Sequence, residues 1–179
     1  MYLIAIGHVS RTGKDTFADY LYTSLSAKGA RVAKASLAYE LKRLAHQLYS
    51  NVGLLEPEAY EGPKAVSKDL PNLKNGMSPR DVWIFLGEKL RQIDPDVWVH
   101  ALKQKCVRVD YLIVPDARHP NECQAADLTI RVDRPGVVAT NDVDKQLLGY
   151  GFDIVVHNDG TLEDLQANAG RIADGIYYG

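Results

Sequence analysis

The chain has 179 residues, 46% of them hydrophobic and 25% charged, which is enough to bury one substantial core, and we expect a single domain over residues 1–179. A net charge of −2 argues against a nucleic-acid-binding module, because such proteins usually carry a basic surplus with interleaved aromatic residues. Neither a signal peptide nor a membrane-spanning segment is visible, so we expect a cytoplasmic protein with no membrane partner. Cys106 and Cys123 have no partners at metal-ligand spacing and are expected to be reduced thiols.

A strand and a glycine-bounded loop open the chain. The apolar run Leu3–Ile6 shows no alternation, which predicts a strand buried on both faces of a parallel sheet. Gly7 and Gly13 permit positive φ and close backbone approach, and Lys14 begins a helix whose free N–H groups face the loop. This order is typical of a phosphate-binding loop, in which backbone N–H groups and the lysine bind phosphate oxygens while a hydroxyl holds Mg²⁺.

The loop departs twice from the G-x-x-x-x-G-K-[ST] pattern. His8 occupies the position of the first glycine, with Gly7 one residue early. Asp15 stands where the metal-binding Ser or Thr is expected, and Thr16 follows one residue late. Asp15 could hold Mg²⁺ directly or through water, or it could cap the helix while Thr16 serves the metal. The alternative, an ordinary strand-to-helix turn, is disfavoured because Gly-Lys between a buried strand and a helix is the context that the motif requires.

Two helices and a short strand are expected next. The helix that starts at Lys14 ends before Gly29, a strand covers 31–35, and a second helix covers 37–48. The apolar positions that predict these helices are Phe17, Ala18, Leu21 and Leu25 in the first, and Leu37, Leu41, Leu44, Ala45 and Leu48 in the second. Lys42 and Arg43 belong either to a solvated helix face or to a site for an acceptor phosphate.

Residues 51–77 show no sustained period and are rich in Pro and Gly, so we interpret them as a mobile insertion on the substrate side. Ser78-Pro79-Arg80-Asp81 then reads as a helix cap, and the apolar face of that helix is Val82, Leu86, Leu90 and Ile93. Arg80 opposes the helix dipole in the first turn, which suggests a bound anion, although a plain surface arginine is the alternative. Asp94-Pro95 caps a further helix, and we expect Trp83 and Trp98 in the core rather than as base-stacking platforms.

A second chemical signal follows the buried run Tyr111–Val114. Asp116 lies at the carboxyl end of this strand, where a carboxylate can hold Mg²⁺ through its water shell. Arg118 could bind a phosphate with its planar fork. Alone, Asp-x-Arg could equally be a turn with a surface ion pair.

The last third of the chain predicts two more strands and a helix. A strand covers 128–132, and Arg131 and Arg134 lead into an irregular segment, 134–151, that suits a lid over transferring phosphates. A solvated loop is the alternative for either arginine. A fifth strand covers 154–156, and after a turn at 157–160 a helix capped by Thr161 has its buried side at Leu162, Leu165, Ala169, Ile172 and Ile176.

Motifs along nearly the whole chain resemble those of the deoxynucleoside monophosphate kinases of tailed bacteriophages. They are Gly-Lys-Asp-Thr at 13–16, Ser-Pro-Arg at 78–80, Leu-Gly at 86–87, Ile-Asp-Pro-Asp-Val-Trp at 93–98, Pro-Asp-Ala-Arg-His-Pro-Asn-Glu at 115–122, Arg-Pro-Gly at 134–136 and the segment 157–165. The resemblance implies an α/β fold, the three-layer P-loop kinase sandwich with a five-stranded parallel sheet in the order 2-3-1-4-5. It also implies ATP-dependent, Mg²⁺-assisted phosphorylation of a deoxynucleoside 5′-monophosphate to the diphosphate.

The resemblance also assigns roles to residues. Those for ATP are Gly7, Arg11, Thr12, Gly13, Lys14, Asp15 and Thr16 around the phosphates and Asn158, Asp159 and Gly160 beside the adenine. For catalysis the candidates are Lys14, Asp116 and Arg118 from the resemblance, with Arg131 and Arg134 from the lid-like pattern. For the acceptor they are Arg80 and Arg118 from the resemblance, with Lys42 from its place on a basic helix face. For the metal they are Asp116 from the resemblance, with Asp15 and Thr16 from the loop pattern. A kinase for another small acceptor, such as dephospho-coenzyme A, and a non-catalytic nucleotide-binding switch are the alternatives. A homodimer is left open.

Overall fold

The computed structural model describes residues 1–7, 9–106, 108–139 and 142–179, and the chain forms two compact units. Unit 1 comprises Met1–Ser36 and Lys103–Gly179, and unit 2 comprises Leu37–Leu102. Within the described residues, no helix is long and apolar enough to cross a bilayer.

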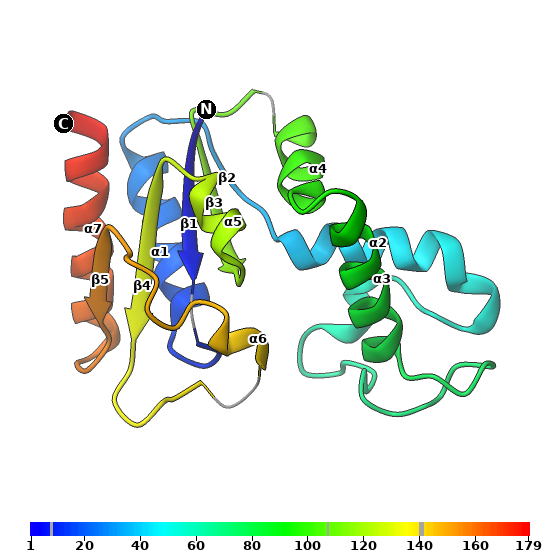
Figure 1. Ribbon diagram of the computed structural model, residues 1–179. Helices are drawn as coiled ribbons and strands as arrows, with labels where there is room; N and C mark the ends of the chain where they lie inside the picture. The colour runs from blue at the N-terminus through cyan, green and yellow to red at the C-terminus, as the bar shows by residue number, and fades with distance from the viewer. Residues whose placement is uncertain (8, 107, 140–141) are drawn as a thin grey trace. The chain divides into compact units, whose positions relative to one another are not determined.

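Unit 1 contains five parallel strands in the order β2-β3-β1-β4-β5, which confirms the expected α/β fold and strand order (Figure 1). The strands are β1 (Tyr2–Gly7), β2 (Val32–Lys34), β3 (Tyr111–Ala117), β4 (Leu128–Asp133) and β5 (Ile154–His157). Its helices are α1 (Lys14–Ala27), α5 (Pro120–Gln124), α6 (Asp142–Lys145) and α7 (Leu162–Tyr178). The carboxyl ends of all five strands therefore share one edge, where open α/β sheets bind ligands.

Alternate residues of β1 face two different layers. Ile4 and Ile6 pack into a core formed with α1 and α7, where the apolar positions predicted for the first helix are fully buried. Each such buried side chain contributes about 1.5–3 kcal/mol to folding. Ala5 faces the opposite layer, a smaller cluster with Ala117, Cys123 and Leu147. Helix and loop layers thus cover both faces of the central strand, and Gly7 ends it at the edge of the sheet.

The ends of the helices match the predictions in part. Gly29 adopts the expected left-handed conformation, with φ of 88°, and α1 stops before it. Leu162 was expected to be buried but is exposed at the beginning of α7, because the packed face starts at Leu165. The short helices α5 and α6 were not predicted. Both cysteines carry thiols rather than a disulfide, and burial raises the pKa of Cys123 to about 12.

Unit 2 is built from α2 (Leu37–Tyr49), the short 3-10 helices η1 (Ser50–Val52) and η2 (Pro57–Tyr60), α3 (Pro79–Ile93) and most of α4 (Val97–Lys105). The cap predicted for α3 is present: the Ser78 hydroxyl accepts a hydrogen bond from the Asp81 N–H, and the Asp81 carboxylate accepts one from the Ser78 N–H. Leu48 and Ile93, at the ends of α2 and α3, were expected on buried faces but are exposed.

The segment 51–77 is anchored in the core of unit 2. Leu54, Tyr60 and Leu73 are buried there with Val82 and Trp83. The Tyr60 and Trp83 rings meet edge to face, with centroids 5.0 Å apart. Trp98 is buried as well, so both tryptophans are core residues, as expected.

Candidate active site

The loop between β1 and α1 has the backbone shape of an anion cradle. Gly13 is the N-cap of α1 with φ of 93°, and Arg11 has φ of 68°, both in the left-handed region. Left-handed residues before a helix turn successive N–H groups toward a common point, which favours a bound anion. His8, predicted at the first glycine position, lies outside the described residues.

Gly13 is required by its backbone conformation, and Gly7 lies in a tightly packed position. A Cβ on Gly13 would lie 2.5 Å from Asn158 Nδ2, which donates to the Thr12 carbonyl at 2.8 Å. Gly7 does not need positive φ; a Cβ there would meet Ala117 O at 3.2 Å and Leu147 Cδ1 at 3.1 Å. The residue that follows β5, Asn158, therefore packs directly against the loop.

Lys14 begins α1, as expected, and it is only 6% exposed. Its Nζ donates to the Val9 carbonyl at 3.5 Å, an oxygen that also accepts from the Thr12 hydroxyl at 3.2 Å. Burial lowers the pKa of Lys14, and the positive charge of Arg118 adds to this, whereas nearby carboxylates oppose it. A desolvated ammonium of this kind gains strongly from an anionic ligand.

Asp116 and Arg118 lie at the carboxyl end of β3. The Asp116 carboxylate accepts a hydrogen bond of 2.7 Å from the hydroxyl of Ser36, which follows β2. Arg118 lies in the turn before α5, and Glu122 fixes that turn by accepting from the N–H groups of Arg118 at 2.8 Å and His119 at 3.1 Å. The pattern His-Pro-x-Glu, a cap residue followed by Pro and an acid at N3, is the signal from which α5 could have been predicted.

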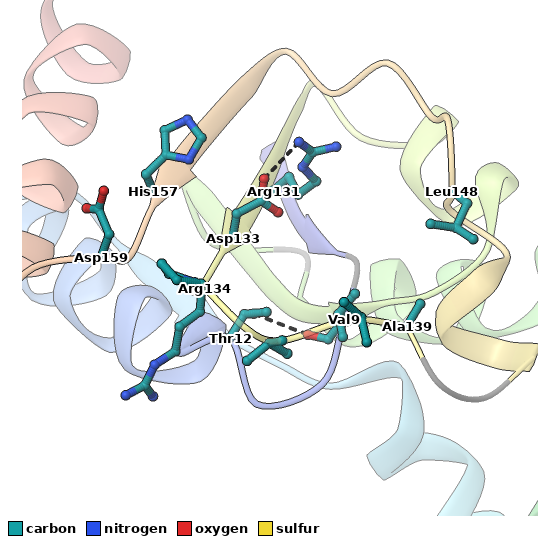
Figure 2. Close-up of a pocket in the computed structure, with 12 residues that line it drawn as sticks. Val9, Thr12, Arg131, Asp133, Arg134, Ala139, Leu148, His157 and Asp159 are labelled. Atoms are coloured by element: carbon teal, nitrogen blue, oxygen red, sulfur yellow. Dashed lines mark hydrogen bonds and ion pairs between the residues drawn. The ribbon is translucent and has the colours of Figure 1, made fainter.

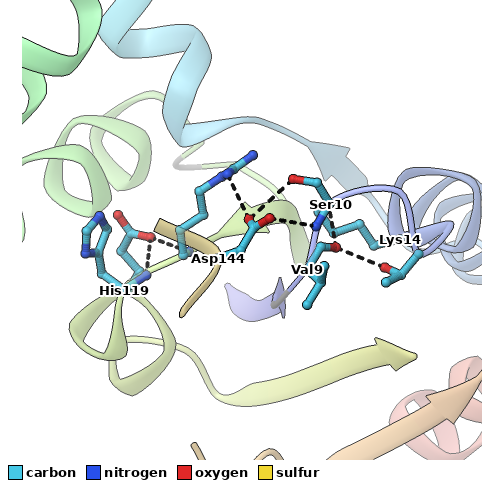
Figure 3. A network of polar contacts seen from close by, with 8 residues as sticks. Val9, Ser10, Lys14, His119 and Asp144 are labelled. Atoms are coloured by element: carbon cyan, nitrogen blue, oxygen red, sulfur yellow. Dashed lines mark hydrogen bonds and ion pairs between the residues drawn. The ribbon is translucent and has the colours of Figure 1, made fainter. Parts of the chain in front are cut away.

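Asp144 is the site residue that sequence reasoning missed (Figure 3). It comes from α6, and its side chain is 2% exposed. Its carboxylate accepts from the N–H of Ser10 at 3.4 Å, from the Ser10 hydroxyl at 3.3 Å and from Arg118 Nη1 at 3.2 Å. No signal in the irregular segment 134–151 distinguished this acid from the others, because only the tertiary fold brings it to the loop.

A cavity of about 450 Å³ opens where β4 and β5 end beside the loop (Figure 2). Its lining comes from the loop, the strand ends and the segment after β4: Val9, Thr12, Arg131, Asp133, Arg134, Pro135, Val137, Val138, Ala139, Leu148, His157 and Asp159. Figure 2 shows His157 and Asp159 on one side, with Ala139 and Leu148 opposite. The cavity is large enough for one small aromatic ligand group.

The predicted arginines differ in their surroundings. Arg131 Nη2 donates to Asp133 at 2.8 Å, and among the described residues its buried Nε has no hydrogen-bond partner. Arg134 is exposed, and its guanidinium points away from the Arg131 and Asp133 pair (Figure 2). Asp159 lines the cavity. Asn158 instead binds the loop backbone, and Gly160 lies against the Asp164 cap of α7.

The acceptor candidates of unit 2 are engaged by carboxylates of the same unit. Arg80 forms an ion pair with Asp69 through Nε, which offers a partner for its position in the first turn of α3. Lys42 Nζ pairs with Glu61 at 2.5 Å and lies 5.2 Å from the centroid of the Trp83 ring.

Asp15, Thr16 and Asp116 are the oxygen donors near the loop that could hold a magnesium ion jointly with phosphates. Gly13 is the N-cap of α1, and Asp15 is exposed in the first turn of this helix. The helix dipole stabilises a negative charge at that position. Within the described part of the chain, no group of three or more His, Cys, Asp or Glu residues could hold a metal by itself. Mg²⁺ usually binds one or two carboxylates plus substrate phosphates and water, which Asp116 with Asp15 or Thr16 could satisfy.

Comparison with protein-family models and with curated proteins gives no match to this chain. The fold and the site therefore define a class, an α/β protein with a phosphate-loop-like turn at the carboxyl edge of its sheet, and function rests on the residues themselves.

Proposed function

We propose that the protein is an ATP-dependent deoxynucleoside monophosphate kinase. The observation that carries the proposal is the buried Lys14 ammonium under a Gly13-capped loop at the carboxyl edge of the sheet. Phosphoryl transfer passes through a loose transition state whose charge lies on oxygens, so it needs positioned cations and N–H groups rather than a protein nucleophile.

The donor nucleotide is proposed to lie along unit 1. Its phosphates take the loop N–H groups and Lys14, and its base takes the cavity lined by Arg131, His157 and Asp159. Asp116, with Asp15 or Thr16, would hold Mg²⁺, which when bound neutralises phosphate charge. Arg134 is exposed and lines the cavity. We propose that its side chain turns toward the phosphoryl group during transfer.

The acceptor phosphate is proposed to bind Arg118, whose backbone is fixed by Glu122. A planar guanidinium matches phosphate geometry in a way that lysine does not. The resemblance assigns Arg80 to the acceptor as well, and Lys42 is a candidate from the charge pattern of its helix; each would have to exchange its carboxylate partner for the ligand.

A coupled assay of ADP release tests the proposal against a panel of deoxynucleoside and ribonucleoside monophosphates and dephospho-coenzyme A. We expect turnover with one or more deoxynucleoside monophosphates. Turnover with dephospho-coenzyme A alone would identify a kinase for another acceptor, and ATP binding without acceptor-dependent turnover would indicate a nucleotide-binding switch.

A further inference from the structure

The carboxylate of Asp144 occupies donors that a phosphate group would use. It accepts from the loop N–H of Ser10 and from Arg118, and its charge is close enough to Lys14 to favour the ammonium. These three groups have separate origins, the loop, the turn after β3 and the start of α1. Figure 3 shows Ser10 bonded to the buried carboxylate of Asp144, with Lys14 beside Val9 in the same network.

The contacts that the Asp144 carboxylate makes with Ser10 and Arg118 are longer than hydrogen bonds to a carboxylate usually are. The three hydrogen bonds measure 3.2–3.4 Å, whereas charge-assisted N–H to carboxylate bonds are typically about 2.7–2.9 Å. Asp144 also has to be buried to make them, with 2% of its side chain exposed. The donors are therefore filled by an anion that binds them less closely than a well-fitted one would.

We propose that Asp144 is an internal stand-in for phosphate groups: a donor polyphosphate must displace it from the loop N–H of Ser10, and the acceptor phosphate must displace it from Arg118. This inference rests on the proposed function in taking the loop as a polyphosphate site and Arg118 as the acceptor site. Two anions cannot share one set of donors, so the affinity for polyphosphate is reduced by the fraction of molecules in which Asp144 holds them. If that fraction is about nine-tenths, the apparent Kd is raised about tenfold.

The test compares Asp144→Asn with Asp142→Asn, using inorganic tripolyphosphate as the probe in isothermal titration calorimetry. Asp142 is a matched control, because it belongs to the same helix, its side chain is 95% exposed, and its ion pair among the described residues is the local one with Lys145 at 3.2 Å. We expect Asp144→Asn to bind tripolyphosphate about tenfold more tightly or better, and Asp142→Asn to match the wild type. Equal or weaker binding by a folded Asp144→Asn variant would overturn the inference and would make Asp144 a positioning residue for Arg118.

A measurement on the wild-type protein does not depend on how the variant folds. Saturating tripolyphosphate should speed hydrogen exchange in the peptide that covers 142–150, because displacement of Asp144 releases α6 and the turn in which the Leu148 N–H bonds the Lys145 carbonyl. Unchanged or slower exchange in that peptide would contradict displacement.

The results separate this inference from the proposed kinase activity. If ATP binds and is turned over while Asp144→Asn binds tripolyphosphate like the wild type, the kinase proposal stands and displacement fails. If Asp144→Asn binds tightly but no acceptor is phosphorylated, displacement stands and the kinase proposal fails. If neither protein binds tripolyphosphate, the loop is not a polyphosphate site and both fail.

Discussion

Gly13 combines a backbone constraint with a steric one. Its φ of 93° strains any other residue, and a Cβ would lie 2.5 Å from Asn158 Nδ2. We expect Gly13→Ala to lower the free energy of unfolding by about 1–3 kcal/mol, the usual cost of a strained backbone. In the double variant with Asn158→Ala the clash is relieved but φ is not, so denaturant unfolding should show partial recovery. Full recovery would mean that φ carries no cost, and no recovery would mean that Asn158 does not clash.

Lys14 is proposed to stabilise the transferring phosphoryl group, whereas its burial as a cation lowers the stability of the fold. We expect Lys14→Met to reduce phosphoryl transfer on the order of 10³-fold or more, as for other groups that stabilise developing charge, while the protein stays folded. The measurements are steady-state kinetics and circular dichroism on the same preparation. Near-native turnover by the folded variant would remove the phosphate-loop assignment.

The same residue predicts a pH dependence of stability. Burial lowers the pKa of Lys14 below 10.5, so in the window beneath that value the unfolded chain binds the proton more tightly than the native protein does. Stability then rises with pH in this window. Denaturant unfolding at about pH 7 and about pH 9.5 should show the wild type gaining stability relative to Lys14→Met at the higher pH. A flat or falling difference would show that Lys14 is not buried as a cation.

The sequence predicted most residues of the candidate site, but not the contacts that bury Lys14 and bring Asp144 to the loop. Gly7, Gly13, Lys14, Asp116 and Arg118 all lie at one sheet edge within unit 1, as the motifs indicated. The burial of Lys14 and the carboxylate of Asp144 could not be read from the chain, because both depend on contacts made by distant segments.

At the scale of elements, α5 and α7 both begin with a capping box, but only the one at α5 adjoins the candidate site. Glu122 at the start of α5 accepts from the turn that carries Arg118, and Asp164 caps α7 by accepting from the Thr161 N–H at 2.9 Å. Both Glu122→Ala and Asp164→Ala should lower the unfolding temperature, because each leaves helix N–H groups without a partner. Only Glu122→Ala should also raise the acceptor KM, since it frees the backbone of Arg118. If both variants alter the KM equally, the effect is one of stability and Arg118 is not held by α5.

Long periodic elements were predicted well, and short ones were not. Phe17, Leu21 and Leu25 repeat over a helix long enough for its face to be read, and all three are fully buried. Helix α5 has five residues and α6 has four, too few for any period to appear. The apolar faces of α2 and α3 extend past their packing partners, which is why Leu48 and Ile93 are exposed.

At the scale of the whole molecule, strand order was expected from the resemblance rather than from spacing, and it is confirmed. The division into two units, with a separate core around Trp83 in unit 2, was not predicted. The segment 51–77 lacks a period because it is held by single buried anchors such as Leu54 and Leu73, not by a continuous face. Patterns of that kind carry little information before the fold is known.

The central claim is that the protein moves a phosphoryl group from ATP to a nucleoside monophosphate. The most direct measurement is ³¹P NMR of the wild-type protein with Mg²⁺, ATP and a deoxynucleoside monophosphate from the coupled assay. We predict that deoxynucleoside diphosphate and ADP resonances grow at equal rates, and that neither grows with Lys14→Met. Growth of inorganic phosphate in place of the deoxynucleoside diphosphate, or no change with any acceptor, would contradict the account.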